Sequence, residues 1–299
     1  NLCYFENSLV KENFIEILNY LDEPLADAAI IPLYFVSKYA KKNITVALSG
    51  DGGDEVFGGY SKYKAQDFIE KYHYLKFISG LAKKLFKKDS SYFKFLDSFD
   101  ESFYSRQFIF GSGGFLSEEV SNLVKDYSFS IDEIFSEAKE YDSLFKQEDN
   151  INRSLYLDCK IQLPDWYLVK GDRATMANSL EMRNPLLDKE LAEFAFSLNG
   201  SWKIRDGEQK YLLKKLVSKY IDKDIIYREK KGFGVPLGDW IKNELKDLFD
   251  EFLFIDNGFF DLNYVRKLYD QHLERRVDNE FKLLRILGFN YWYRKYYEF

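Results

Sequence analysis

The feature that most constrains the fold of this chain is a short apolar run followed directly by a loop of glycines and acids. Ile44 to Leu48 is rich in β-branched residues and flanked by structure-breaking residues, a pattern typical of a buried parallel strand. Ser49 to Gly53 then turns the chain, and the residues from Asp54 to Gly58-Gly59 are expected to be helical. This order predicts an α/β unit that binds ligands beyond the carboxyl end of its strand.

Helical spacing of apolar residues predominates elsewhere. It predicts a helix from residue 14 to 21 and a second from residue 30 to 39, the latter followed by basic residues that suit a helix C-terminus. Residues 62–150 are aromatic, charged and poor in strand signals, and helical periodicity resumes at 152–180 and 208–220. We therefore expect a helix-rich α/β chain without a clear linker.

The glycine-acid loop carries the chemistry. Its glycines permit positive φ, and the following helix start offers free N–H groups and partial positive charge to an anion such as phosphate. Three carboxylates, those of Asp51, Asp54 and Glu55, oppose this, because each would cost roughly 4 kcal/mol against a phosphate at about 4 Å and a dielectric near 20. A phosphate here therefore requires Mg²⁺, held by one or two carboxylates and phosphate oxygens, or an incoming Lys or Arg.

Composition excludes several alternatives. From the residues alone, Asp51 and Asp54 could equally be helix caps, whereas the alternating ligands of a calcium loop are absent. The two histidines make a Ser-His pair or a two-histidine metal site improbable. Cys3 and Cys159 are too few for a disulfide framework, so we expect free thiols in a reducing cytoplasm.

Charge and hydropathy limit the partners. The net charge of −6 argues against a general nucleic-acid binder, and Lys83, Lys84, Lys87 and Lys88 are interrupted by apolar residues, which favours a solvated amphipathic helix. The longest apolar run, Ala28 to Val36, is about half a membrane span. No secretory signal opens the chain, so we expect no nucleic-acid partner, no membrane and a cytoplasmic location.

The segment SGDGGDEVFGGY at residues 49–60 resembles the second signature of the asparagine synthase family. Further blocks follow the family's order: LDEPLAD and IPLY at 21–34, LPD to LVKGDRATM at 163–176 with SLEMRNPLLD at 179–188, and KYLL at 210–213 with REKKGFGVP at 228–236. The resemblance covers roughly residues 8–245. It implies a remnant of a parallel-sheet adenine-nucleotide alpha-hydrolase-like (HUP/PP-loop) domain, with an incomplete α/β nucleotide-binding part at about 1–65 and a mainly helical part at about 66–299.

The resemblance also implies a reaction. Such enzymes activate a carboxylate with ATP as an acyl-adenylate, releasing pyrophosphate, and ammonia then displaces AMP to give an amide. The implied site comprises the catalytic residues Asp51 and Lys230, the nucleotide-binding residues Ser49, Gly50, Gly52 and Gly53, and the Mg²⁺ ligand Asp54. Lys230 would neutralise pyrophosphate from a mobile glycine-flanked loop.

Other charged residues in the matching blocks have simpler explanations. Lys230 and Lys231 could be a solvated basic pair, and Asp172 with Arg173 is expected to form a structural ion pair. Arg183 and Asp188 are expected to be packing and turn elements around Pro185. Asp22, Glu23 and Asp27 either line a substrate pocket or cap helix ends.

The sequence departs from the family pattern in two places. The family's ATP-binding loop, Ser-Gly-Gly-x-Asp-Ser, belongs upstream of Asn1, and SGGFLS at residues 112–117 is predicted to be only a turn because Leu116 replaces the aspartate. The family's glutaminase domain, which starts with a catalytic cysteine, is not matched, and Cys3 lacks the surrounding motif. We therefore expect the C-terminal part of a synthetase, inactive alone, with a glutaminase domain or another ammonia source as partner.

The acyl substrate stays open. Residue 51 is Asp where asparagine-forming members usually have Glu, and bacterial relatives with this variant amidate other carboxylates, including those of cell-surface saccharides. An inert scaffold that uses the aromatic C-terminal helix, and a homodimer, remain alternatives. A β-lactam-forming relative is disfavoured, because such proteins place a base such as tyrosine at position 51.

Overall fold

The computed structural model describes residues 9–86, 91–108, 114–115, 117–125, 130–229, 232 and 234–297. Within these residues the chain is helix-rich with one small sheet, as expected. The elements are α1 (Val10–Asn19), α2 (Ile30–Ala40), β1 (Val46–Leu48), α3 (Gly53–Phe57), α4 (Ser61–Lys71), η2 (His73–Leu75), α5 (Lys76–Ala82), η3 (Lys83–Leu85), α6 (Ser91–Asp97), η4 (Ser98–Asp100), α7 (Phe103–Phe108), α8 (Ser117–Leu123), α9 (Ile131–Ile134), α10 (Ser136–Leu144), α11 (Asn150–Leu157), η5 (Asp158–Leu168), α12 (Val169–Met176), β2 (Glu181–Arg183), η6 (Pro185–Leu187), α13 (Lys189–Ser197), η7 (Gly200–Trp202), α14 (Tyr211–Val217), α15 (Lys223–Ile226), α16 (Leu237–Lys242), α17 (Lys246–Phe252), α18 (Leu262–Leu273) and α19 (Glu280–Tyr297).

The sheet consists of two parallel strands that come from distant parts of the chain. In the register of β1 and β2, Val46 pairs with Glu181 and Leu48 with Arg183, so each of the two predicted parts of the chain contributes one strand. The predicted parallel pairing is confirmed. The prediction that this strand is buried is wrong, because Val46 is 38% and Leu48 74% exposed. Burial of a strand depends on the layers around it, which its own sequence does not specify.

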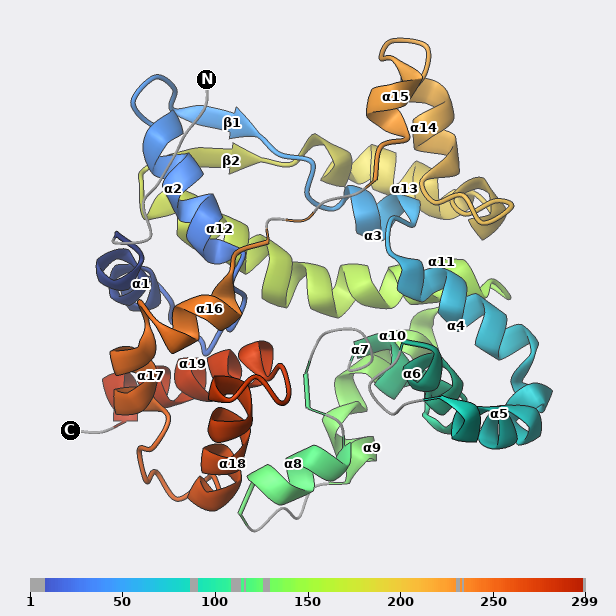
Figure 1. Ribbon diagram of the computed structural model, residues 1–299. Helices are drawn as coiled ribbons and strands as arrows, with labels where there is room; N and C mark the ends of the chain where they lie inside the picture. Colours follow the sequence, from blue (N-terminus) through green and yellow to red (C-terminus); the bar gives the residue numbers. More distant parts are fainter. Residues whose placement is uncertain are drawn as a thin grey trace.

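A long helical path crosses the centre of the molecule, below this sheet in the view of Figure 1. It runs through α11, η5 and α12, and its middle stretch, η5, has π-helical hydrogen bonding and contains Pro164. Proline cannot donate the backbone hydrogen bond of a regular α-helix, so a local change of winding is expected around it. Asp149 caps the start of the path by accepting hydrogen bonds from the N–H groups of Ile151 and Asn152.

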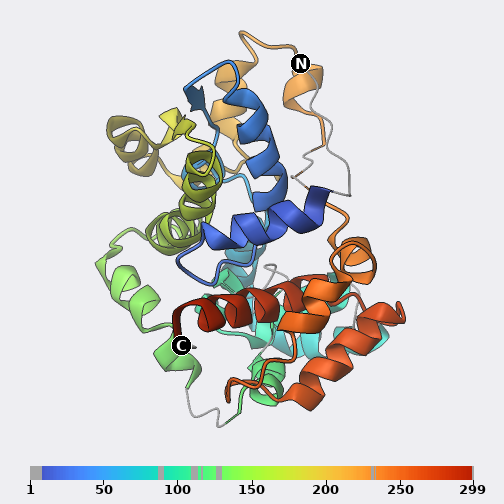
Figure 2. The same ribbon diagram turned by 90° about the vertical axis from the view of Figure 1, so that its left-hand side faces the viewer.

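The main hydrophobic core joins the two ends of the described chain. It brings α1, α2 and α12 together with α16 to α19, and the side chains of Tyr34, Trp240, Phe249 and Tyr269 are among its largest buried members. Figure 2 shows α1 lying close to α19, and the two helices are in contact. Among the described residues, we find no helix with the length and apolar character needed to cross a bilayer.

Candidate functional site

The loop of residues 49–53 leaves β1 at its carboxyl end and leads directly into α3. The N–H of Ser49 extends the strand pairing by donating to the carbonyl of Arg183 at 2.8 Å, and the N–H of Gly53 closes the turn on the carbonyl of Gly50 at 3.2 Å. The N–H of Asp51 donates to Oγ of Ser49 at 3.3 Å. The strand, loop and helix predicted from the sequence are therefore confirmed.

Gly52 occupies the N-cap position of α3 with φ +83°, in the left-handed region that favours glycine. A Cβ at this position would overlap the side chain of Leu187. The N-cap residue is Gly52, and no side chain bonds the first N–H groups of α3. The alternative in which Asp51 or Asp54 caps this helix is therefore wrong.

Asp54 forms an ion pair that the sequence analysis missed. The Nζ of Lys210 lies 3.0 Å from Oδ1 of Asp54, and both side chains are largely shielded from solvent. The pair fits because Gly59 lies against it, where a Cβ would overlap the Asp54 carboxylate and the Lys210 stem. Lys210 stood in a block that resembled the family, but no spacing rule connected it to residue 54.

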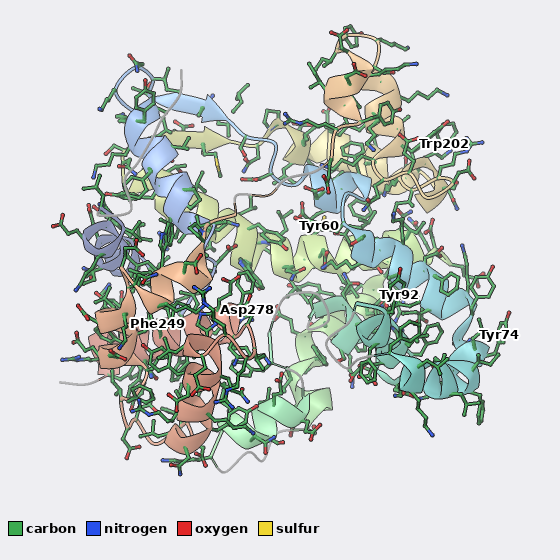
Figure 3. The ribbon with its side chains drawn as sticks, in the orientation of Figure 1. Tyr60, Tyr74, Tyr92, Trp202, Phe249 and Asp278 are labelled. Carbon is green, nitrogen blue, oxygen red and sulfur yellow. The ribbon has the colours of Figure 1, made fainter. Side chains whose placement is uncertain are left out.

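The third acid of the loop, Glu55, points away from any ligand at the loop. It is 2% exposed, and its carboxylate accepts a hydrogen bond from the hydroxyl of Tyr60 at 2.7 Å. Burial raises the pKa of Glu55, and the Tyr60 hydrogen bond partly opposes this. Figure 3 shows Tyr60 between α3 and α4. The repulsion estimated from three carboxylates is therefore reduced to that of Asp51 and a partly neutralised Asp54.

Asp51 lies between the sheet and the central helix. A Cβ built on Gly171 of α12 would lie 3.7 Å from Oδ2 of Asp51 and would overlap Met182 of β2. Glycine at position 171 thus gives the loop close access to α12. Ser49 and Gly50 begin the same loop, and Lys210 lies near its far end, at Gly53 and Asp54. Lys230 lies outside the described residues, so its predicted position at this site stays a prediction.

The other acidic and basic residues of the matching blocks are engaged in structural contacts. Arg173 pairs with Asp22 at 2.5 Å and lies 3.8 Å from Asp172, so its main partner differs from the expected one. Arg183 pairs with Glu181, and Asp188 caps α13. The N–H of Asp188 also donates to the carbonyl of Pro185 at 3.2 Å, so its expected place in a turn around Pro185 is confirmed.

Asp27 lies in the turn before α2 and at the edge of a cavity. Its Oδ1 accepts a hydrogen bond from the N–H of Ala29 at 2.9 Å, but Ala29 is the N-cap residue of α2 and no side chain caps this helix, so the capping alternative is wrong for Asp27. Its Oδ2 accepts from Nε1 of Trp166 at 3.0 Å and from Nζ of Lys170 at 2.7 Å. It also lines a cavity of about 370 Å³ that reaches Tyr60.

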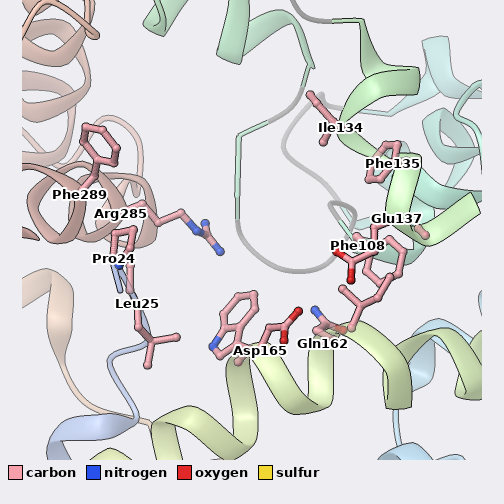
Figure 4. Close-up of a pocket in the computed structure, with 14 residues that line it drawn as sticks. Pro24, Leu25, Phe108, Ile134, Phe135, Glu137, Gln162, Asp165, Arg285 and Phe289 are labelled. Atoms are coloured by element: carbon pink, nitrogen blue, oxygen red, sulfur yellow. The ribbon is translucent and has the colours of Figure 1, made fainter. Parts of the chain in front are cut away.

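A larger cavity of about 550 Å³ adjoins this one, and the two share lining residues from several elements: Ala26, Phe108, Gln162, Trp166 and Arg285. Aromatic rings form much of its wall, and charged groups enter from opposite sides (Figure 4). In that view Arg285 reaches in from α19, while Gln162 of η5 faces it from across the space. Gly171, which lies beside Asp51, and Tyr167 and Gln162, which line the smaller cavity, all belong to the helical path through η5 and α12.

In the part of the chain that the structure describes, no three His, Cys, Asp or Glu side chains gather closely enough to hold a metal by themselves. The expected Mg²⁺ site needs only one or two carboxylates plus phosphate oxygens, so this finding does not bear on it. Cys159 is a free thiol, and burial raises its pKa to about 12.

These features define a helix-rich α/β protein with a glycine-acid loop at the end of a parallel strand. The asparagine synthase family profile matches residues 1–294. Asparagine synthetase [glutamine-hydrolyzing] 1 of Bacillus subtilis is 33% identical over 93% of this chain and 45% of its own length. A putative asparagine synthetase of Mycobacterium tuberculosis H37Rv is 30% identical over 95% of this chain and 44% of its own.

A more distant relative is amidase chry2 of Gibberella zeae, which is 24% identical over 80% of this chain and 39% of its own length. The chain therefore spans less than half the length of the curated relatives that it matches. The profile match shows that the chain belongs to the asparagine synthase family. The resemblance seen in the sequence is thereby confirmed.

Proposed function

We propose that this chain provides the synthetase part of an ATP-dependent amidotransferase, which activates a carboxylate as an acyl-adenylate for attack by ammonia and forms an amide, AMP and pyrophosphate. Family membership supports the amidotransferase class. The observation that carries the proposal is the Lys210–Asp54 pair at the end of β1, because it supplies a cation beside the loop predicted to bind a polyanion.

The roles follow from where the groups lie. The loop backbone from Ser49 to Gly53 offers N–H groups at a helix start, which suits phosphate. Asp51, against Gly171, borders the expected position of the acyl group. Lys210 is placed to exchange Asp54 for a phosphate oxygen, and Lys230 is proposed to neutralise the leaving pyrophosphate.

The residues at the loop fit Mg²⁺ by their chemistry. Asp54 and Asp51 present hard carboxylate oxygens, the donors that this ion prefers, and phosphate oxygens can complete its coordination. When bound, Mg²⁺ would offset negative charge on the triphosphate. Release of Asp54 from Lys210 then frees the ammonium group for the same polyanion.

The test is AMP and pyrophosphate release by the full-length protein supplied with ATP, Mg²⁺, ammonia and a carboxylate. Lys210→Ala, Asp54→Asn and Lys230→Ala are each expected to lower this rate at least tenfold, a loss typical of removing an electrostatic contact to the transition state. Lys189→Ala is the control, because the Lys189 side chain is 85% exposed on α13. Wild-type rates in all three site variants would contradict the proposal. The isolated chain, assayed beside it, tests the expectation that it has little activity.

The two adjoining cavities favour an acceptor larger than aspartate, such as a saccharide carboxylate. A space of about 550 Å³ with aromatic walls and a few charged groups is the size that drug-sized ligands occupy. We expect a panel of carboxylates to show faster AMP release with a sugar acid than with aspartate. Trp166→Ala should reduce that preference, whereas faster release with aspartate would assign the protein to asparagine formation.

A further inference from the structure

The helical segment that follows α4 exposes its apolar side chains. Tyr74, Phe77, Ile78, Leu81 and Leu85 recur at intervals of three and four residues, so they form one stripe along η2, α5 and η3. Phe77 is 92%, Leu81 69% and Leu85 84% exposed. Figure 1 places α5 at an outer edge of the molecule, and Figure 3 shows Tyr74 projecting outward beside it.

In this segment the apolar side chains face solvent, whereas in a helix packed on a core they face inward. Its inward side carries small residues, with Ser79 only 4% exposed and its hydroxyl donating to the carbonyl of Lys76 at 2.7 Å. A surface helix normally turns its apolar stripe inward. The stripe from Tyr74 to Leu85 therefore faces away from this chain's own core, as expected for a surface that binds something else.

Charge identifies the kind of partner. Residues 71–88 contain six lysines and one histidine but no Asp or Glu, within a chain of net charge −6. Of these lysines, three that the structure describes have carboxylate partners: Lys71 pairs with Asp67, Lys76 with Asp100, and Lys83 with Asp97 and Asp100. The Lys71 and Lys76 side chains are more than half exposed, so their pairs are weak and their ammonium groups can exchange a carboxylate for an external phosphate. Lys84 is exposed beside Leu85.

We propose that the stripe from Tyr74 to Leu85 docks on an anionic membrane surface, with α5 and η3 lying in the plane of the lipid headgroups. Interfacial helices bind in this way, with aromatic and aliphatic side chains at the acyl boundary and lysines at anionic headgroups. Tyr72 and Tyr92, 39% and 68% exposed, add rings suited to the interface. This proposal departs from the expectation of no membrane partner, which rested on the length of the longest apolar run; the contact proposed here is peripheral and needs no spanning segment.

A second copy of the chain is a poorer occupant. A twofold dimer through this stripe would bring the lysine-rich segments of both partners together, because both use the same surface. Nucleic acid would contact the lysines but would leave the exposed Phe77 and Leu81 in water. Anionic lipid covers both kinds of side chain.

The experiment is co-sedimentation of the full-length protein with vesicles of phosphatidylcholine alone and of phosphatidylcholine mixed with phosphatidylglycerol. We expect binding to the mixed vesicles only, weakened by added salt. The double variant Phe77→Ser, Leu81→Ser should bind at least tenfold more weakly, because two apolar side chains no longer enter the lipid. Lys84→Glu should bind at least fivefold more weakly.

Matched controls come from other surfaces. Leu144→Ser replaces a leucine that is 62% exposed on α10, and Lys189→Glu reverses an exposed lysine on α13, so both should bind as the wild type does. The stripe variants remove no core contact, so unchanged melting temperatures and amidotransferase activity in solution are expected. Absence of binding to anionic vesicles, equal binding by the stripe variants, or a dimer in sedimentation that the double variant abolishes would each overturn the proposal.

Discussion

His272 is a buried titratable side chain in the last turn of α18. It is 1% exposed, its Nε2 donates to the carbonyl of Gly238 at 3.0 Å, and its Nδ1 accepts from the N–H of Asn279 at 3.3 Å. This arrangement requires the neutral ring. Burial lowers the pKa of His272, and nearby Lys242 lowers it further, whereas the Gly238 hydrogen bond, Asp278 and Asp239 oppose the shift.

Below about pH 6.5 the unfolded chain therefore binds a proton at His272 that the folded chain resists. The free energy of unfolding should fall as pH drops from that value toward the lower folded pKa, because the unfolded state then binds more protons. Glu280, which accepts from the N–H of Gly238 at 2.7 Å, has a raised pKa and contributes with the opposite sign. Replacing His272 alone therefore separates its effect on the pH dependence of unfolding from that of Glu280.

Denaturant unfolding across about pH 5 to 8 should show a smaller pH slope in His272→Gln than in the wild type. His73→Gln is the control, because His73 is exposed on η2. An identical slope in His272→Gln and the wild type would show that the buried ring is not the cause.

At the scale of elements, the turn between β1 and α3 tests whether glycine is required by geometry or by ligand binding. Gly52 has φ +83° and lies against Leu187, whereas Gly50, two residues earlier, has nothing within 4 Å of a built Cβ. The backbone conformation therefore requires glycine at position 52, whereas at position 50 the fold has room for a side chain.

Gly52→Ala should lower the free energy of unfolding by more than about 1 kcal/mol, because the left-handed conformation alone costs about that much and Leu187 must also move. Gly50→Ala should stay within about 0.5 kcal/mol of the wild type. Thermal unfolding of both variants measures this. Equal stability of the two would mean that the turn adjusts freely.

Secondary structure was predicted correctly where it depends on the residues within the segment itself. The helices at residues 10–19 and 30–40 and the strand at 46–48 follow from apolar spacing and β-branched residues within each segment. The exposure of β1 and the outward stripe of α5 were not predicted. Both depend on which layers lie next to an element, and those layers come from distant segments.

At the scale of the whole molecule, one core links the first described helices to the last. Leu287 of α19 is fully buried in the core that contains α1 and α2, whereas Tyr297 near the end of the same helix is 59% exposed. Because this core spans the chain, loss of packing at its C-terminal side should destabilise its N-terminal side too.

Leu287→Ala should lower the free energy of unfolding by about 2–5 kcal/mol, the usual cost of a large-to-small change in a core. Tyr297→Ala should change it by less than about 0.5 kcal/mol. Denaturant titration followed by both fluorescence and circular dichroism checks whether one transition is kept. Two separate transitions in Leu287→Ala would mean that the ends of the chain fold independently.

Neighbouring residues and ordered blocks were enough to predict the glycine-acid loop after β1, the helix-rich character and the family. Only the tertiary structure paired Lys210 with Asp54 and turned Glu55 inward to Tyr60. Contacts between residues so far apart, and the burial that shifts a carboxyl pKa, exist only once distant helices pack together. Local spacing therefore predicted where the loop lies, whereas packing decided which of its charges face a ligand.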